Sequence, residues 1–68
     1  MLKDFGLVNS SDYVGLPLEE AKNRAQNNGY TTRIVEMDGK GFMVTEDLKN
    51  NRLNFRVRGN VITDVYPG

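Results

Sequence analysis

The strictest pattern in this sequence is the alternation of apolar and polar residues from Arg52 to Arg58. Apolar side chains stand at positions 53, 55 and 57, and polar or charged ones stand between them. Such alternation predicts a strand with one buried face. Gly59-Asn60 then offers a two-residue turn, and residues 61–66 are rich in β-branched side chains. We therefore expect an antiparallel hairpin, so the fold must be built around a β-sheet.

One helix is predicted between Pro17 and Gly29. Proline suits the first helical turn, because its φ angle is fixed and its missing N–H would have no partner there. Two glutamates follow, at the positive end of the helix dipole. Leucine and alanine side chains then recur at i, i+3 and i+7 spacing, which predicts one buried face. Gly29 is the expected left-handed residue just beyond the helix.

Residues 30–37 predict a further strand, because four of them are β-branched. Residues 38–41 break this pattern, and a long connection follows as far as residue 51. Long connections in small domains are usually functional or disordered. This one carries Phe42, Met43, Val44 and Leu48, which is too apolar for a disordered linker. We expect an exposed, ordered loop, with Phe42 at least half buried and with Val44 and Leu48 contacting a partner.

The predicted core follows from these elements. Its members are the apolar residues on the inner faces of the helix and strands: Leu18, Ala21, Ile34, Val35, Leu53, Phe55, Val57 and Val65.

Composition removes whole classes of function. The chain has 68 residues, nine basic and nine acidic side chains, and no Cys, His or Trp. It therefore has no disulfide, no thiolate or imidazole zinc site, no cysteine nucleophile and no Ser-His-Asp triad. Its balanced charge gives no basic field for a phosphate backbone. We expect no enzyme, no cofactor and no nucleic-acid partner, and a small core must stabilise the fold without disulfides.

The sequence offers little support for a site that binds a metal, a phosphate group or a membrane. Asp38, Glu46 and Asp47 lack the fixed spacing and turn glycine of a calcium-binding loop, so we expect no metal. Residues 39–41 are too short for a phosphate-binding loop. No apolar run approaches the length of a membrane span, and the first five residues lack the features of a signal peptide. We expect a monomer that binds no membrane, either intracellular or a mature secreted segment restarted with Met.

Two stretches resemble a known family. The sequence YVGLPLEEAK at 13–22 resembles the start of the helix, LVGK-x-x-EEAK, in the potato inhibitor I family of serine-protease inhibitors. The sequence VTEDLKNNRLN at 44–54 resembles the reactive loop and following strand of that family, closest to its bacterial and fungal offshoot. The final Gly68 matches the family's habit of ending in glycine. The resemblance spans residues 13–68, and residues 1–12 are expected to form an N-terminal arm.

The resemblance implies an α+β fold, in which a single helix packs on a small mixed sheet and an exposed protease-binding loop joins two parallel strands. It places the scissile bond at Glu46–Asp47. The residues expected to bind the protease are Met43, Val44, Thr45, Glu46, Asp47, Leu48 and Lys49. Those expected to support the loop are Arg52, Asn54 and Gly68. Arg52 would hold Thr45 and Asp47, while Asn54 stands where many members carry a second loop-facing arginine.

These features lead to two hypotheses for function. The first is a substrate-like inhibitor of a serine protease of the subtilisin, chymotrypsin or glutamyl type. Because Glu46 would fill the primary specificity pocket, a glutamyl-preferring protease is the better expected target. The second is a non-inhibitory binding module on the same fold, which would use the loop or a sheet edge.

Overall fold

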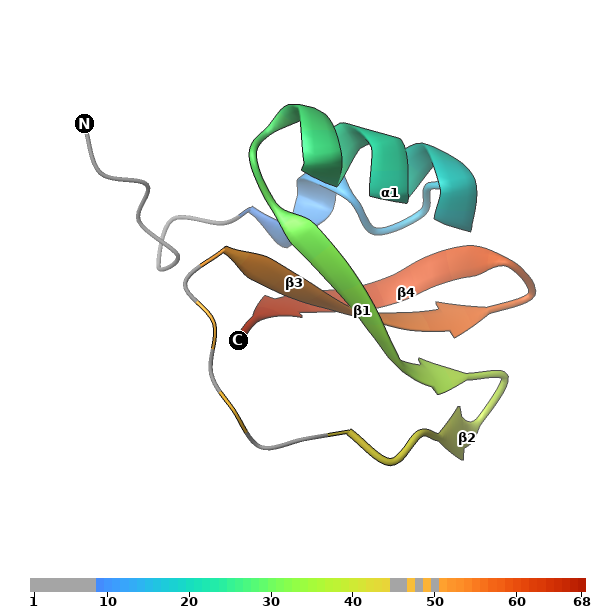
Figure 1. Cartoon of the computed structure of the whole chain (residues 1–68). Coiled ribbons are helices and arrows are strands. Elements are labelled where there is room, and N and C mark those ends of the chain that lie inside the picture. The colour runs from blue at the N-terminus through green and yellow to red at the C-terminus, as the bar shows by residue number, and fades with distance from the viewer. Residues whose placement is uncertain (1–8, 45–46, 48, 50) are drawn as a thin grey trace.

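The chain folds as one helix packed on a four-stranded mixed sheet, which confirms the predicted fold class (Figure 1). The computed structural model describes residues 9–44, 47, 49 and 51–68. The elements in chain order are η2 (Ser10–Asp12), α1 (Leu18–Asn27), β1 (Thr31–Met37), β2 (Lys40–Gly41), β3 (Arg52–Arg58) and β4 (Val61–Pro67). The strand order is β2-β1-β3-β4, with β1 and β3 parallel and the other neighbours antiparallel. The connection 42–50, whose described residues 42–44, 47 and 49 are exposed, therefore joins two parallel strands.

Helix α1 has the predicted position and stops before Gly29 as predicted, but Pro17 lies outside its first turn. Pro17 has an extended backbone (φ −58°, ψ 147°), so the helix begins one residue later, at Leu18. At the other end, Gly29 is left-handed (φ 88°). The amide N–H of Tyr30 donates to the Ala25 carbonyl and that of Gly29 donates to Gln26, which together form a Schellman motif. Residues 1–8 of the predicted arm lie outside the described residues, and 10–12 form the short turn η2.

The core lies between α1 and one face of the sheet. Its buried apolar residues are Tyr13, Leu18, Ala21, Ala25, Leu53, Phe55, Val57, Ile62 and Val65. Most of the predicted core is confirmed, but Ile34 and Val35 are only partly buried. They stand on β1, near the sheet edge, where the β1–β3 register shifts between Ile34 and Glu36. Tyr13 was not predicted, yet only 2% of it is exposed and its ring lies 6.0 Å from that of Phe55.

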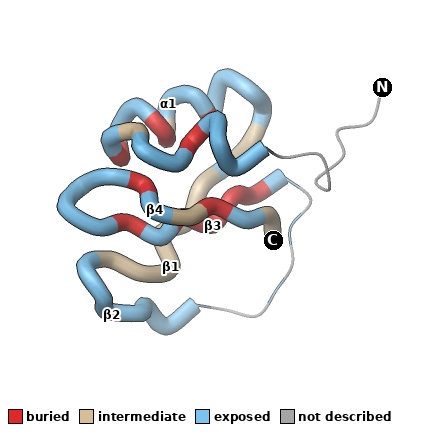
Figure 2. The backbone as a smooth tube through the Cα atoms, turned by 180° about the vertical axis from the view of Figure 1, so that it is seen from behind, coloured by how far each residue is buried: buried red, intermediate tan, exposed pale blue. Residues whose placement is uncertain are grey.

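Strand β3 differs from the prediction of one buried face. Its residues 52–55 are all buried, including Arg52 and Asn54 (Figure 2). The alternation gave the correct direction for each side chain, but not its exposure. Arg52 is covered by contacts with Asp47 and Gly68, and Asn54 lies between two neighbouring strands. Polar burial of this kind depends on the tertiary partners of each side chain, so periodicity alone cannot detect it.

Two tight turns join neighbouring strands of the sheet, one between β1 and β2 and the other between β3 and β4. Asp38 and Gly39 both have positive φ (53° and 86°), as have Gly59 and Asn60 (58° and 66°), which is typical of type I′ hairpins. The second turn was predicted. The first creates β2, which the sequence analysis treated only as a break in the strand pattern. The Gly59 amide donates to Asp38 Oδ1 at 2.8 Å, so the two turns are bonded to each other.

Candidate functional site

The connection between β1 and β3 is fastened at both ends. At its start, the Phe42 amide donates to the Val35 carbonyl at 2.9 Å. At its end, the Thr31 amide donates to the Asn51 carbonyl at 2.7 Å. Both bonds go to β1, so this strand fixes where the loop leaves the sheet and where it returns. A loop with fixed ends loses less entropy when it binds a partner.

The first residues of the loop expose apolar side chains. Phe42 is 47% exposed, slightly less than half, as predicted, while Val44 is 40% exposed. Met43 between them is fully exposed (102%). Consecutive exposed apolar side chains on a small domain are typical of a surface that meets a partner. Thr45, Glu46 and Leu48 lie outside the described residues, so the proposed scissile bond and the expected contact of Leu48 are not described.

Arg52 connects the loop to the sheet. Only 7% of this residue is exposed. Its Nη2 donates to the Asp47 carbonyl oxygen at 2.8 Å, and its Nη1 lies 3.7 Å from Asp47 Oδ2. Hydrogen bonds from a guanidinium are stronger than neutral ones, and the low exposure of Arg52 reduces their screening by solvent. The expected contact with Asp47 is therefore present; Thr45, the other expected partner, is outside the described residues.

Gly68 is the second anchor of this arrangement. Its main-chain oxygen accepts from Arg52 Nε at 3.1 Å and from Nη2 at 2.8 Å. It also accepts from the Lys49 amide at 3.3 Å, and the Gly68 amide donates to the Arg52 carbonyl at 3.1 Å. The ion pair between Lys49 and Asp47 is longer, 3.9 Å, and about half exposed, so it adds little. Arg52 and Asp47, which the resemblance pairs, thus meet in one hydrogen-bonded cluster with Gly68, which it names as a loop-supporting residue.

Asn54 occupies the next position on the same face of β3. It is 1% exposed, its Oδ1 accepts from Arg33 Nε at 2.8 Å, and its Nδ2 donates to the Tyr66 carbonyl at 3.3 Å. The predicted loop-supporting residue is therefore fixed between β1 and β4. Arg33 was not singled out from the sequence. Only the strand register, which sets Arg33 opposite Asn54, reveals it.

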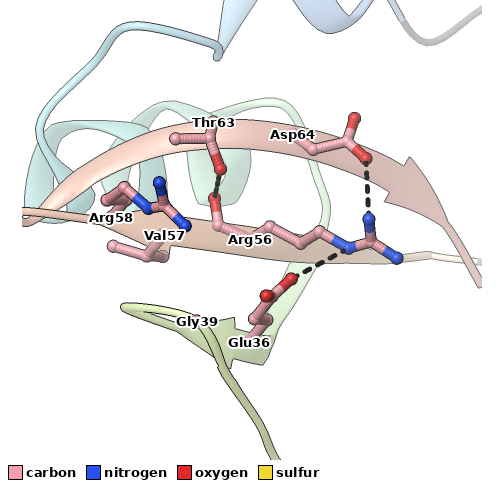
Figure 3. Close-up of a pocket in the computed structure, with 7 residues that line it drawn as sticks. All are labelled: Glu36, Gly39, Arg56, Val57, Arg58, Thr63 and Asp64. Carbon is pink, nitrogen blue, oxygen red and sulfur yellow. Dashed lines mark hydrogen bonds and ion pairs between the residues drawn. The ribbon is translucent and has the colours of Figure 1, made fainter.

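A polar hollow lies further along this face (Figure 3). Arg56 stands between two carboxylates, with Nε 3.5 Å from Glu36 Oε1 and Nη1 3.9 Å from Asp64 Oδ2. The Thr63 hydroxyl donates to the Arg56 carbonyl at 3.1 Å. Each group in Figure 3 that could act as an acid, base or nucleophile is thus engaged with the strand β3 beside it. Both carboxylates that line the hollow are thus paired with Arg56.

Among residues 9–44, 47, 49 and 51–68, no three His, Cys, Asp or Glu side chains gather as metal ligands would. Within the same residues, no helix has the length and apolar character needed to cross a membrane. Comparisons with protein-family models, with curated proteins and with solved structures find no match to this chain.

Proposed function

We propose that this protein is a substrate-like serine-protease inhibitor whose reactive loop presents Glu46–Asp47 as the scissile bond. The observation that carries the proposal is the attachment of Asp47 to buried Arg52, at 2.8 Å, within a cluster closed by Gly68. The sequence resemblance of residues 13–22 and 44–54 to the potato inhibitor I family supports the same function. The connection between parallel β1 and β3, exposed at residues 42–44, 47 and 49, agrees with the fold that this resemblance implies.

The hydrogen bonds of Asp47 give the proposal a mechanism. Cleavage of Glu46–Asp47 would free the amino group of Asp47 while its carbonyl oxygen stays bound to Arg52. The new amino group would then remain beside the acyl group on the protease serine and could attack it again. Such proximity favours resynthesis of the bond over loss of the product. Because Arg52 would still hold Asp47 after cleavage, the loop would bind like a substrate but its net hydrolysis would be slow.

The loop sequence indicates the partner. Glu46 would enter the primary pocket, which favours proteases with a basic pocket. Met43 and Val44, both exposed, would lie against the protease on the side preceding the bond. The partner expected from these side chains is a glutamyl-preferring serine protease with an apolar surface next to its primary pocket.

A panel of trypsin-, chymotrypsin-, elastase- and glutamyl-type proteases tests this specificity. We expect sub-micromolar inhibition of the glutamyl type. Glu46→Leu should weaken that inhibition about 100-fold, because a basic pocket loses its charged partner, and should improve inhibition of chymotrypsin. Glu19→Leu is the matched control, since the Glu19 side chain is 78% exposed on α1. The proposal would be contradicted if none of these proteases were inhibited at sub-micromolar concentration.

A binding module without inhibition is the second candidate. The exposed side chains of Phe42, Met43 and Val44 favour it, because an apolar surface of this kind can bind a partner without any scissile bond. Such a module would form no complex with a protease, or would be digested rapidly. An inhibitor would instead be cut slowly and at one bond.

A further inference from the structure

We propose that Met43 is a modification site, at which oxidation of the thioether by a peroxide weakens binding of the loop to its protease while the fold stays intact. The protease as the partner rests on the function proposed above. The selectivity of the oxidation for Met43 does not, because it is measured on the free chain.

The side chain of Met43 is fully open to solvent. Met43 is 102% exposed, whereas its neighbours Phe42 and Val44 are 47% and 40% exposed. Both neighbours therefore rest partly on the domain, while the thioether between them projects into solvent. Met37, by contrast, is partly buried on β1 and packs against the core. A peroxide in solution can thus reach the sulfur of Met43 without any movement of the fold, and the core shelters that of Met37.

The reaction needs only the thioether and the peroxide. The sulfur attacks one peroxide oxygen, the O–O bond breaks as the S–O bond forms, and the second oxygen leaves as water with both peroxide protons. The sulfur loses two electrons and the peroxide gains them. The chain has no cysteine, so no thiol of its own competes for the oxidant. Methionine sulfoxide reductases restore the thioether, so the modification is reversible.

The main chain beside Met43 has a fixed position. The Phe42 amide donates to the Val35 carbonyl at 2.9 Å, and Gly41 is paired with Glu36 in the β1–β2 hairpin. Met43 therefore follows directly after a residue that is bonded to the sheet, ahead of the proposed scissile bond. A flexible apolar thioether adapts well to an apolar protease surface, whereas a sulfoxide carries a strong acceptor that would lose its water there. Oxidation thus turns a favourable contact into an unfavourable one.

Peroxide treatment followed by peptide mapping tests the selectivity. Trypsin cleaves after Lys40, so Met37 falls on the peptide 34–40 and Met43 on the peptide 41–49. In the folded chain, we expect the second peptide to gain one oxygen about tenfold faster than the first. In urea, which unfolds the chain, the two peptides should react at similar rates, because the difference arises from the fold.

Inhibition of a glutamyl-preferring protease, assayed after the peroxide has been removed, measures the effect on binding. The oxidised chain should inhibit about tenfold less strongly, with unchanged circular dichroism and urea unfolding, and a methionine sulfoxide reductase should restore the inhibition. Met43→Leu keeps an apolar side chain without the sulfur, so its inhibition should not respond to peroxide. Met37→Leu, the same change on β1, is the matched control and should respond as the wild type does.

Equal oxidation rates of the two peptides in the folded chain would overturn the selectivity. Unchanged inhibition after complete oxidation of Met43, or a peroxide response that persists in Met43→Leu, would overturn the effect on binding. A chain that inhibits no protease even before oxidation would contradict the proposed function and, with it, the effect on binding. The peptide map would still decide whether Met43 is the oxidation site.

Discussion

Replacing Arg52 by alanine is expected to accelerate cleavage of the loop about 100-fold, while the free energy of unfolding falls by only about 1–2 kcal/mol. The loop loses the bond to the Asp47 carbonyl, and the cluster at Gly68 loses both of its guanidinium bonds. The core residues between α1 and the sheet keep their packing, since the Arg52 side chain lies on the opposite face. The change therefore acts mainly on the order of the loop.

This prediction is measured by the time course of loop cleavage and by urea unfolding of the same variants. Arg58→Ala removes a guanidinium from the exposed end of β3 and should leave both quantities near their wild-type values. Arg52→Lys should recover only part of the protection, because an ammonium cannot bond Asp47 and Gly68 with the same planar geometry. Equal cleavage rates in Arg52→Ala and the wild type would contradict the role given to Arg52.

Replacing Phe55 by alanine is expected to remove a large part of the free energy of unfolding. Phe55 is fully buried at the centre of the core, and loss of such a ring costs about 3–5 kcal/mol. At about 0.05–0.15 kcal/mol per residue, a chain of this size has only about 3–10 kcal/mol of stability in total. No disulfide is present to compensate, since the chain has no cysteine.

Circular dichroism and urea unfolding measure this effect. Phe42→Ala is the matched control, because it removes the same side chain from a position that is 47% exposed. It should change the free energy of unfolding by less than about 1 kcal/mol. If Phe55→Ala and Phe42→Ala were equally stable, the packing between α1 and the sheet would not be what stabilises the fold.

The strands and the helix could be predicted where turn or cap residues and the apolar periodicity indicate the same element. The hairpin around Gly59-Asn60 and the helix that stops before Gly29 have strong local signals, and both are present. Strand β2 was missed, although Asp38-Gly39 is a favoured type I′ turn, because only two residues follow it in the strand. Tyr13 was missed because it follows a cluster of turn-forming residues, and its burial arises from Phe55, far away in the sequence.

The candidate site was predicted in part. The resemblance placed Arg52 against Thr45 and Asp47 and named Gly68 as a loop-supporting residue. Arg52, Asp47 and Gly68 meet in the structure, whereas Thr45 lies outside the described residues. The partnership of Asn54 with Arg33 could not be predicted, because it depends on the register of two strands separated by the whole loop. Local patterns predict which side a strand residue faces. They do not predict which residue of another strand will be its partner.

The most direct test of the proposed function is the fate of the Glu46–Asp47 bond in an equimolar mixture with a glutamyl-preferring serine protease. Mass spectrometry of the mixture over time identifies every bond that is cut, and gel filtration follows the complex. An inhibitor acting as proposed would remain in the complex and be cut slowly, at Glu46–Asp47 alone, toward a stable mixture of intact and cleaved chains. Rapid digestion at several bonds, or no complex at all, would contradict the proposal.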